Sequence, residues 1–269
     1  MAHPQIAAYA RLADGNASAK RAIAGQKTLL SRTAHGIAYD EIRDRFMIPS
    51  FYGQAILVFK GGSEGEVAPM QVIQGPLTEL VAPDRLAYDS LHNEIYIPQG
   101  DEVLVFDGSA NGNVAPIRIL KGPDTDMKAG NVAIDPVNNL MVVGGMQRKG
   151  DGQLQVFNRA DNGNVKPMRT IRGPNTQLNY LFGPFAVHPP TGAIVAGIRT
   201  YDELASDNCF VGVWNLHDEG DVPPRWRIGG PQGILRQVRG VALDPAHKTL
   251  IVSDKRINGV LTFYFPEMF

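Results

Sequence analysis

The sequence contains only one cysteine, Cys209, among its 269 residues. A single cysteine excludes an internal disulfide bond and is typical of a reducing compartment, so cytoplasmic localisation is the expectation. Cys209 falls at the start of an expected strand and has no cationic neighbour in the sequence. We therefore predict a buried thiol without a catalytic role.

Three further absences restrict the partners. The chain lacks an apolar run of about 18 residues, which a membrane-spanning helix needs. Its first twenty residues lack the compact apolar segment of a signal peptide. The net charge is −1 and the basic residues form no stripe, which argues against nucleic acid. The remaining partners are a polar small molecule, a protein, or a second copy that binds through a spare terminal strand.

The sequence has no helical periodicity, but it contains a repeating unit of about 50 residues. Each unit has an aromatic residue that closes a strand, then a turn glycine, and then a segment that ends at a glycine, usually followed by proline. The aromatic residues are separated by 50, 47, 51, 57 and 51 residues: Tyr9, Phe59, Phe106, Phe157, Trp214 and Phe265. Repeats of this length without helical pattern indicate the blades of a β-propeller.

Each unit predicts four short strands, named A to D in chain order. In the second unit they fall at residues 86–88, 94–97, 103–106 and 117–120. Strand A carries an alanine at one position in every unit: Ala38, Ala87, Ala133, Ala186 and Ala242. Asp, Asn, Gly and Pro recur at the turns, where they have structural roles.

The strand count predicts a single all-β domain over residues 1–269, with five four-stranded blades. Five A–B pairs and five D strands are present, but residues 5–9 look like a sixth C strand. We expect residues 19–24 to complete the last blade and so to join the two ends of the chain. One C strand, 5–9 or 260–265, is then spare. A six-bladed ring, or a ring closed by a partner chain, is the alternative.

The segment Arg239-Gly240-Val241-Ala242-Leu243-Asp244-Pro245 and the later Val252-Ser253-Asp254 resemble the repeats of NHL and gluconolactonase-like (SMP-30-type) propellers. His35-Gly36-Ile37-Ala38-Tyr39-Asp40 fits the same pattern. The resemblance implies a propeller fold and a divalent metal, Ca²⁺, Mg²⁺ or Zn²⁺, at the channel mouth. It places Asp254 at the position of one acidic ligand. The position of the family's Asn ligand is occupied by other residues here, including His35, Asp84 and Arg239.

The D–A and B–C loops of a propeller open on the same face, where we expect a site. The candidate catalytic residues are His35, Asp84 and Arg239, the candidate metal ligands are Asp84 and Asp254, and the candidate ligand-binding residues are Tyr52, Arg199, Tyr201 and Lys255. An extended loop, Ile198 to Asn208, carries Arg199 and Tyr201 on this face. Several of these residues also fit structural roles: Asp84 and Arg239 in ion pairs between blades, and Asp254 as the cap of the turn before Lys255.

Two functions follow from this set. The first is a non-catalytic propeller that binds a ligand or a protein on the loop face. The second is a metal-assisted hydrolase or lyase acting on a polar small molecule, with His35, Asp84 and Asp254 as ligands or bases and Arg239 neutralising an anion.

Overall fold

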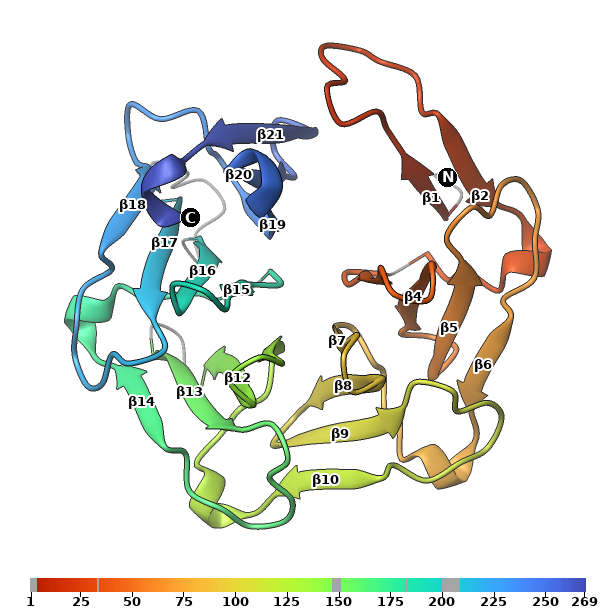
Figure 1. The fold of residues 1–269 in the computed structure, drawn as a ribbon, viewed down its shortest axis with the longest axis horizontal. Coiled ribbons are helices and arrows are strands. Elements are labelled where there is room, and N and C mark those ends of the chain that lie inside the picture. The colour runs from red at the N-terminus through yellow and green to blue at the C-terminus, as the bar shows by residue number, and fades with distance from the viewer. Residues whose placement is uncertain (1–3, 33, 147–150, 182, 200–208) are drawn as a thin grey trace. The chain divides into compact units, whose positions relative to one another are not determined.

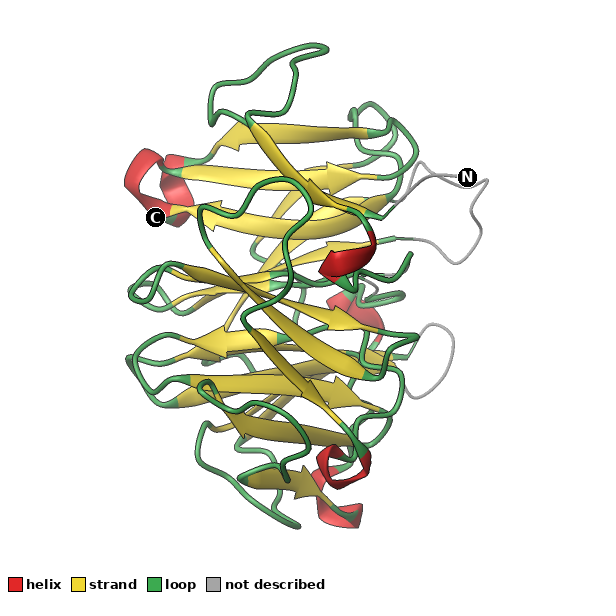
Figure 2. Ribbon diagram, turned by 90° about the vertical axis from the view of Figure 1, so that its right-hand side faces the viewer, coloured by secondary structure: helices red, strands yellow, loops and turns green. Residues whose placement is uncertain are grey.

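The fold is all-β, as predicted from the repeat. The computed structural model describes residues 4–32, 34–146, 151–181, 183–199 and 209–269 (Figure 1). Within these ranges the strands pair antiparallel, and the helices are short 3₁₀ turns in the connections (Figure 2). No helix in the described ranges has the length and apolar character that crossing a bilayer requires.

The chain divides into two compact units. Residues 1–97 with 105–117 form the N-terminal unit, and residues 98–104 with 118–269 form the C-terminal unit. One sheet, formed by strands within residues 87–121, contains residues of both ranges.

The N-terminal unit begins with the hairpin β1 (Gln5–Ala8) and β2 (Arg21–Ala24). The next sheet has strands β3 (Ala38–Asp40), β4 (Arg45–Ser50), β5 (Ala55–Lys60) and β6 (Gln71–Gln74). The following sheet has strands β7 (Ala87–Asp89), β8 (Glu94–Gln99), β9 (Glu102–Asp107) and β10 (Arg118–Lys121). Short helices η1 (Gln26–Thr28) and η2 (Pro76–Thr78) follow β2 and β6.

The C-terminal unit contains two complete sheets and a shorter one. The first has β11 (Asn131–Asp135), β12 (Leu140–Met146), β13 (Gly152–Asn158) and β14 (Arg169–Arg172). The second has β15 (Ala186–His188), β16 (Ala193–Ile198), β17 (Phe210–Asn215) and β18 (Trp226–Gly229). The last has β19 (Val238–Asp244), β20 (Thr249–Asp254) and β21 (Gly259–Tyr264). The 3₁₀ turns are η3 (Pro123–Thr125), η4 (Pro174–Thr176), η6 (Pro245–His247) and η7 (Pro266–Met268).

The predicted strand order is confirmed in all four complete sheets, which follow the order A, B, C, D. The five alanines lie on the A strands β3, β7, β11, β15 and β19. Apolar side chains from neighbouring sheets form the core. In the C-terminal unit Val142, Leu154 and Ile171 pack in one cluster with Ile194 and Trp214.

The strands at each end of the chain pair with their neighbours in the sequence. β2 pairs with β1 along one edge, and Ile23 of β2 forms a parallel bridge to Gly65 along the other. Residues 21–24 therefore pair with β1, and the partner of β21 is β20. The physical reason is that a short connection brings β1 to β2 at a small entropic cost of loop closure.

The aromatic residue that closes the last strand of the last sheet is not the predicted Phe265. Phe59 pairs with Phe46, and the residue that pairs with the equivalent Leu250 is Phe263. Phe265 lies beyond β21 and packs edge-on against Trp226, with ring centroids 5.7 Å apart. The sequence pattern could not distinguish the two, because residues 263 and 265 point to the same face of a strand.

Loops between strands C and D hold neighbouring sheets together. The turn glycine of each loop forms a parallel bridge to the outer strand of the preceding sheet: Ile23 with Gly65, Ile73 with Gly112, Leu120 with Gly163, and Ile171 with Gly220. The side chain of the residue that follows each turn glycine accepts a hydrogen bond from the 3₁₀ turn that comes after this outer strand. Its donors are the backbone N–H groups of Lys27, Leu77, Asp124 and Asn175, and its acceptors are Glu66, Asn113, Asn164 and Asp221.

Candidate functional site

His35 and Asp84 meet in the N-terminal unit. His35 lies in the connection before β3, and Asp84 lies in the connection before β7. The His35 Nδ1 is 2.6 Å from the Asp84 Oδ1, and the two side chains are 44% and 33% exposed. Gly36 permits this approach, because a Cβ at its position would lie only 3.1 Å from the Arg85 Cα. The structure thus brings two of the predicted site residues together.

Arg85 forms an ion pair with the Asp84 carboxylate. The other oxygen of Asp84, Oδ2, accepts a short hydrogen bond from the Arg85 guanidinium, whose side chain is only 5% exposed. The guanidinium thus gives the Asp84 carboxylate a charged hydrogen-bond donor. A carboxylate that accepts from Nδ1 favours the tautomer with its proton there, which leaves Nε2 as the ring's acceptor nitrogen.

Tyr52 adds an exposed aromatic ring at the same end of the β3–β6 sheet. It lies in the turn between β4 and β5 and is 61% exposed. The Arg32 guanidinium carbon lies 5.7 Å from the centre of the Tyr52 ring, a cation–π distance. Arg32 is three residues before His35, so this contact ties the Tyr52 turn to the His35 connection.

The C-terminal unit holds the other described candidates. Arg239 lies at a β-bulge in β19, between Val238 and Gly240, which pair with Asp254 and Ser253 of β20. Lys255 is exposed and follows directly in the turn after β20. Arg239, Asp254 and Lys255 are therefore at one end of the β19–β21 sheet.

Asp254 is buried and caps two segments of backbone. Its Oδ2 accepts from the N–H groups of Arg236 and Gln237, both at 2.7 Å. Its Oδ1 accepts from the N–H groups of Arg256, at 2.9 Å, and Ile257, at 3.3 Å. Four donors occupy the acceptor sites of the carboxylate. The predicted cap of the turn at Lys255 is confirmed, and this arrangement leaves Asp254 poorly suited to hold a metal.

Arg199 is buried beside Tyr180 in the C-terminal unit. It is the first residue after β16. Its guanidinium carbon lies 4.4 Å from the centre of the Tyr180 ring. Tyr201 lies outside the described residues. Cys209 is fully buried, as predicted, and burial raises the pKa of its thiol.

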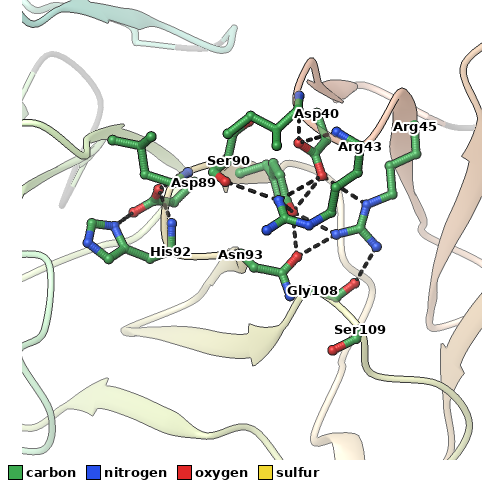
Figure 3. Close-up of polar contacts among 12 residues, drawn as sticks. Asp40, Arg43, Arg45, Asp89, Ser90, His92, Asn93, Gly108 and Ser109 are labelled. Carbon is green, nitrogen blue, oxygen red and sulfur yellow. Dashed lines mark hydrogen bonds and ion pairs between the residues drawn. The ribbon is translucent and has the colours of Figure 1, made fainter.

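A larger polar network lies at the opposite ends of the β3–β6 strands (Figure 3). The buried Arg45 guanidinium donates to Asp40, Gln71, Tyr88, Asn93 and the Gly108 carbonyl. Burial disfavours ionisation of Asp40, but hydrogen bonds from Tyr88, Arg45 and Arg43 outweigh it and lower the Asp40 pKa. Arg45 and Asp40 make these hydrogen bonds with each other, with neighbouring side chains and with backbone, so this network is structural.

Carboxylate, imidazole and thiol groups do not gather in threes in the described ranges, and no metal-holding cluster is found there. Asp84 contributes one carboxylate with His35 beside it, and Asp254 is engaged by backbone.

Two interactions were missed by the sequence reasoning. Arg32 and Tyr180 contact predicted site residues, yet each contact joins positions about 20 residues apart without a fixed motif. The only available signal was their place in loops on the predicted face, which many other polar residues share.

The fold and these loops define a β-propeller with a polar cluster on its D–A and B–C connections. No family model matches the chain, and no curated protein matches its sequence. Among solved structures, it is similar to a Kuenenia stuttgartiensis hydrazine synthase, with a TM-score of 0.58 and 14% identity over 83% of this chain and 56% of that one.

It is also similar to a chain in a crystal structure of the mitotic checkpoint complex, with a TM-score of 0.56 and 17% identity over 85% of this chain and 62% of that one. The chain thus spans less than two thirds of either structure. At these identities the similarity supports the propeller fold alone.

Proposed function

We propose that this chain is a binding propeller that recognises a polar small molecule at His35, Asp84, Arg32 and Tyr52. The His35–Asp84 hydrogen bond carries the proposal, because it orients an exposed imidazole on a loop face. Arg32 adds an exposed positive charge beside an exposed ring. The ligand class that fits is a hydroxylated carboxylate: hydroxyl groups bond to imidazole, and the carboxylate pairs with guanidinium.

The resemblance to gluconolactonase-like repeats points to the same class of molecule. Sugar acids and their lactones carry the hydroxyl and carboxyl groups that this cluster can bind. We take gluconate as the first probe. A protein ligand on the same loops is the broader alternative within the binding hypothesis.

Isothermal titration calorimetry with gluconate tests the proposal. His35→Ala should weaken binding at least tenfold, because it removes the oriented imidazole. The matched control is His92→Ala. His92 forms the same kind of contact with Asp89, at 2.7 Å, but in the turn between β7 and β8. Equal affinity for the wild type and both variants, or no heat with any sugar acid tested, would contradict the proposed site.

The enzymatic alternative rests on the same pair. A histidine whose Nδ1 is held by a carboxylate presents Nε2 as a general base. On this hypothesis the His35 Nε2 would take a proton from the water that attacks the lactone carbonyl and return it to the ring oxygen as the acyl C–O bond breaks. The lactone family implied by the resemblance also uses a metal, for which Asp84 and Asp254 were the predicted ligands.

Hydrolysis of glucono-1,5-lactone, followed by pH-stat titration, separates the two functions. Catalysis lost in His35→Ala supports the hydrolase, whereas binding of gluconate without turnover supports the binding propeller. Elemental analysis of the purified protein, repeated with the Asp84→Ala/Asp254→Ala double variant, tests the metal.

A further inference from the structure

The N-terminal unit contains a cavity of about 180 Å³ between the β1–β2 hairpin and the β3–β6 sheet. One wall is a face of the hairpin, where Ile6 pairs with Ile23 and Ala8 pairs with Arg21. Paired residues, and residues two apart in one strand, point to the same side of a sheet. The small side chain of Ala8 therefore leaves space directly beside Arg21.

The opposite wall comes from β3 and β4, where Tyr39 pairs with Phe46. Phe46 is buried and stacks on Phe59, with ring centroids 5.3 Å apart, and it belongs to the same apolar cluster as Ile23. Aromatic and aliphatic side chains thus form most of the lining. An apolar cavity of about 150 Å³ is enough to hold one benzene molecule. This cavity accordingly has room for a single aromatic ring.

Arg21 gives the lining its positive charge. Its guanidinium has no hydrogen bond or ion pair with the described residues. The neighbouring Tyr39 hydroxyl donates to the Asp44 Oδ1 at 2.6 Å. This hydrogen bond is the main reason that the Tyr39 pKa is raised, and the charge of the nearby Arg21 acts against that shift. Asp44 lies outside the lining, so Arg21 determines the sign of charge that the cavity accepts.

We propose that this cavity binds a small carboxylic acid with one aromatic ring. The ring packs against Phe46 and Tyr39, and the carboxylate accepts two N–H bonds from the Arg21 guanidinium. A neutral ring leaves the guanidinium without its anion, and an anion without a ring leaves the apolar walls unfilled. None of the lining residues belongs to the gluconate site proposed above, so this is a second, separate site.

A ligand-detected NMR titration of the full chain with benzoate tests the charge. Benzoate should bind at least tenfold more tightly than benzamide, which has the same shape without the charge, and than acetate, which has no ring. Arg21→Met should weaken benzoate at least tenfold and bring it to the level of benzamide, because it removes the charged donors. The matched control is Arg11→Met, an exposed arginine of the β1–β2 connection that does not line the cavity. It should bind benzoate like the wild type.

Filling the cavity tests its shape. Ala8→Leu should abolish benzoate binding, whereas Ala10→Leu, at an exposed position outside the lining, should not. Circular dichroism checks that both variants fold. Three results would overturn the proposal: no benzoate binding to the wild type, binding no tighter than that of acetate, or an affinity unchanged by Arg21→Met. Benzoate binding that is lost in His35→Ala but kept in Arg21→Met would overturn it too, because the acid would then occupy the gluconate site.

Discussion

At the scale of single residues, the environment of a side chain decides its role more than its chemical type. Arg45–Asp40 and Arg225–Asp218 are both Arg–Asp pairs, at 2.9 Å and 2.6 Å. The first is buried and satisfies five acceptors, whereas Arg225 is half exposed. A buried charge that loses its partner is costly, whereas an exposed ion pair contributes little.

We therefore expect Arg45→Met to lower the free energy of unfolding by about 3–5 kcal/mol, because it leaves the Asp40 carboxylate buried without its cation. Arg225→Met is the matched control and should cost about 0–1 kcal/mol. Urea unfolding followed by circular dichroism measures both. Equal, small losses in the two variants would show that the buried network is not stabilising.

At the scale of elements, a loop and the strand that it covers act as one unit. Asn113 joins its loop to the preceding sheet: its Oδ1 accepts from the Leu77 N–H at 2.8 Å, and Gly75 leaves room for its side chain. The equivalent positions carry Glu66, Asn164 and Asp221, so the requirement is an acceptor oxygen and not a particular residue.

Asn113→Ala should therefore cost about 0.5–1.5 kcal/mol, the usual contribution of one hydrogen bond. Asn113→Asp keeps the acceptor oxygen, as Asp221 does, and should retain wild-type stability at pH 7. The urea midpoints of the two variants check this. Similar losses in Ala and Asp would mean that packing of the asparagine, and not its oxygen, matters.

At the scale of the whole molecule, both units contain a group whose pKa is lowered on folding. Burial lowers the pKa of His188 below 6.5 in the C-terminal unit. The Asp40 pKa lies below 3.8 in the N-terminal unit, because its hydrogen bonds outweigh its burial. Each group contributes stability above its unfolded pKa and loses it as the pH falls through its folded pKa.

Stability should accordingly fall in two pH ranges, first below pH 6.5 and then below pH 3.8. His188→Gln should flatten the first decline and Asp40→Asn the second, because each removes the titrating group. Urea midpoints measured from pH 7.5 to pH 3 give the comparison. A wild-type decline below pH 6.5 that persists unchanged in His188→Gln would assign it to other groups.

The strands could be predicted from the sequence because their signals are local. Alternating apolar residues, turn Asn-Gly pairs and the alanine of strand A each act within a few positions. The candidate site was predicted in part. His35 and Asp84 were placed on one face from the repeat. Their contact, however, joins residues 49 positions apart in the sequence, and it depends on the close approach of the two connections at Gly36. The roles of Arg32 and Tyr180 needed coordinates, since a cation–π contact has no sequence spacing.

The sequence by itself determined the fold class, the number of A–B pairs and the residues that build the turns. The reason is that the same strand-forming and turn-forming residues recur at equivalent positions of each repeat. Tertiary structure decided how the ends of the chain pair, which aromatic residue closes the last sheet, and that Asp254 caps backbone. These outcomes depend on competition between segments with similar patterns, such as Gln5–Ala8 and Gly259–Tyr264. Only the edges and burial of the folded strands resolve that competition.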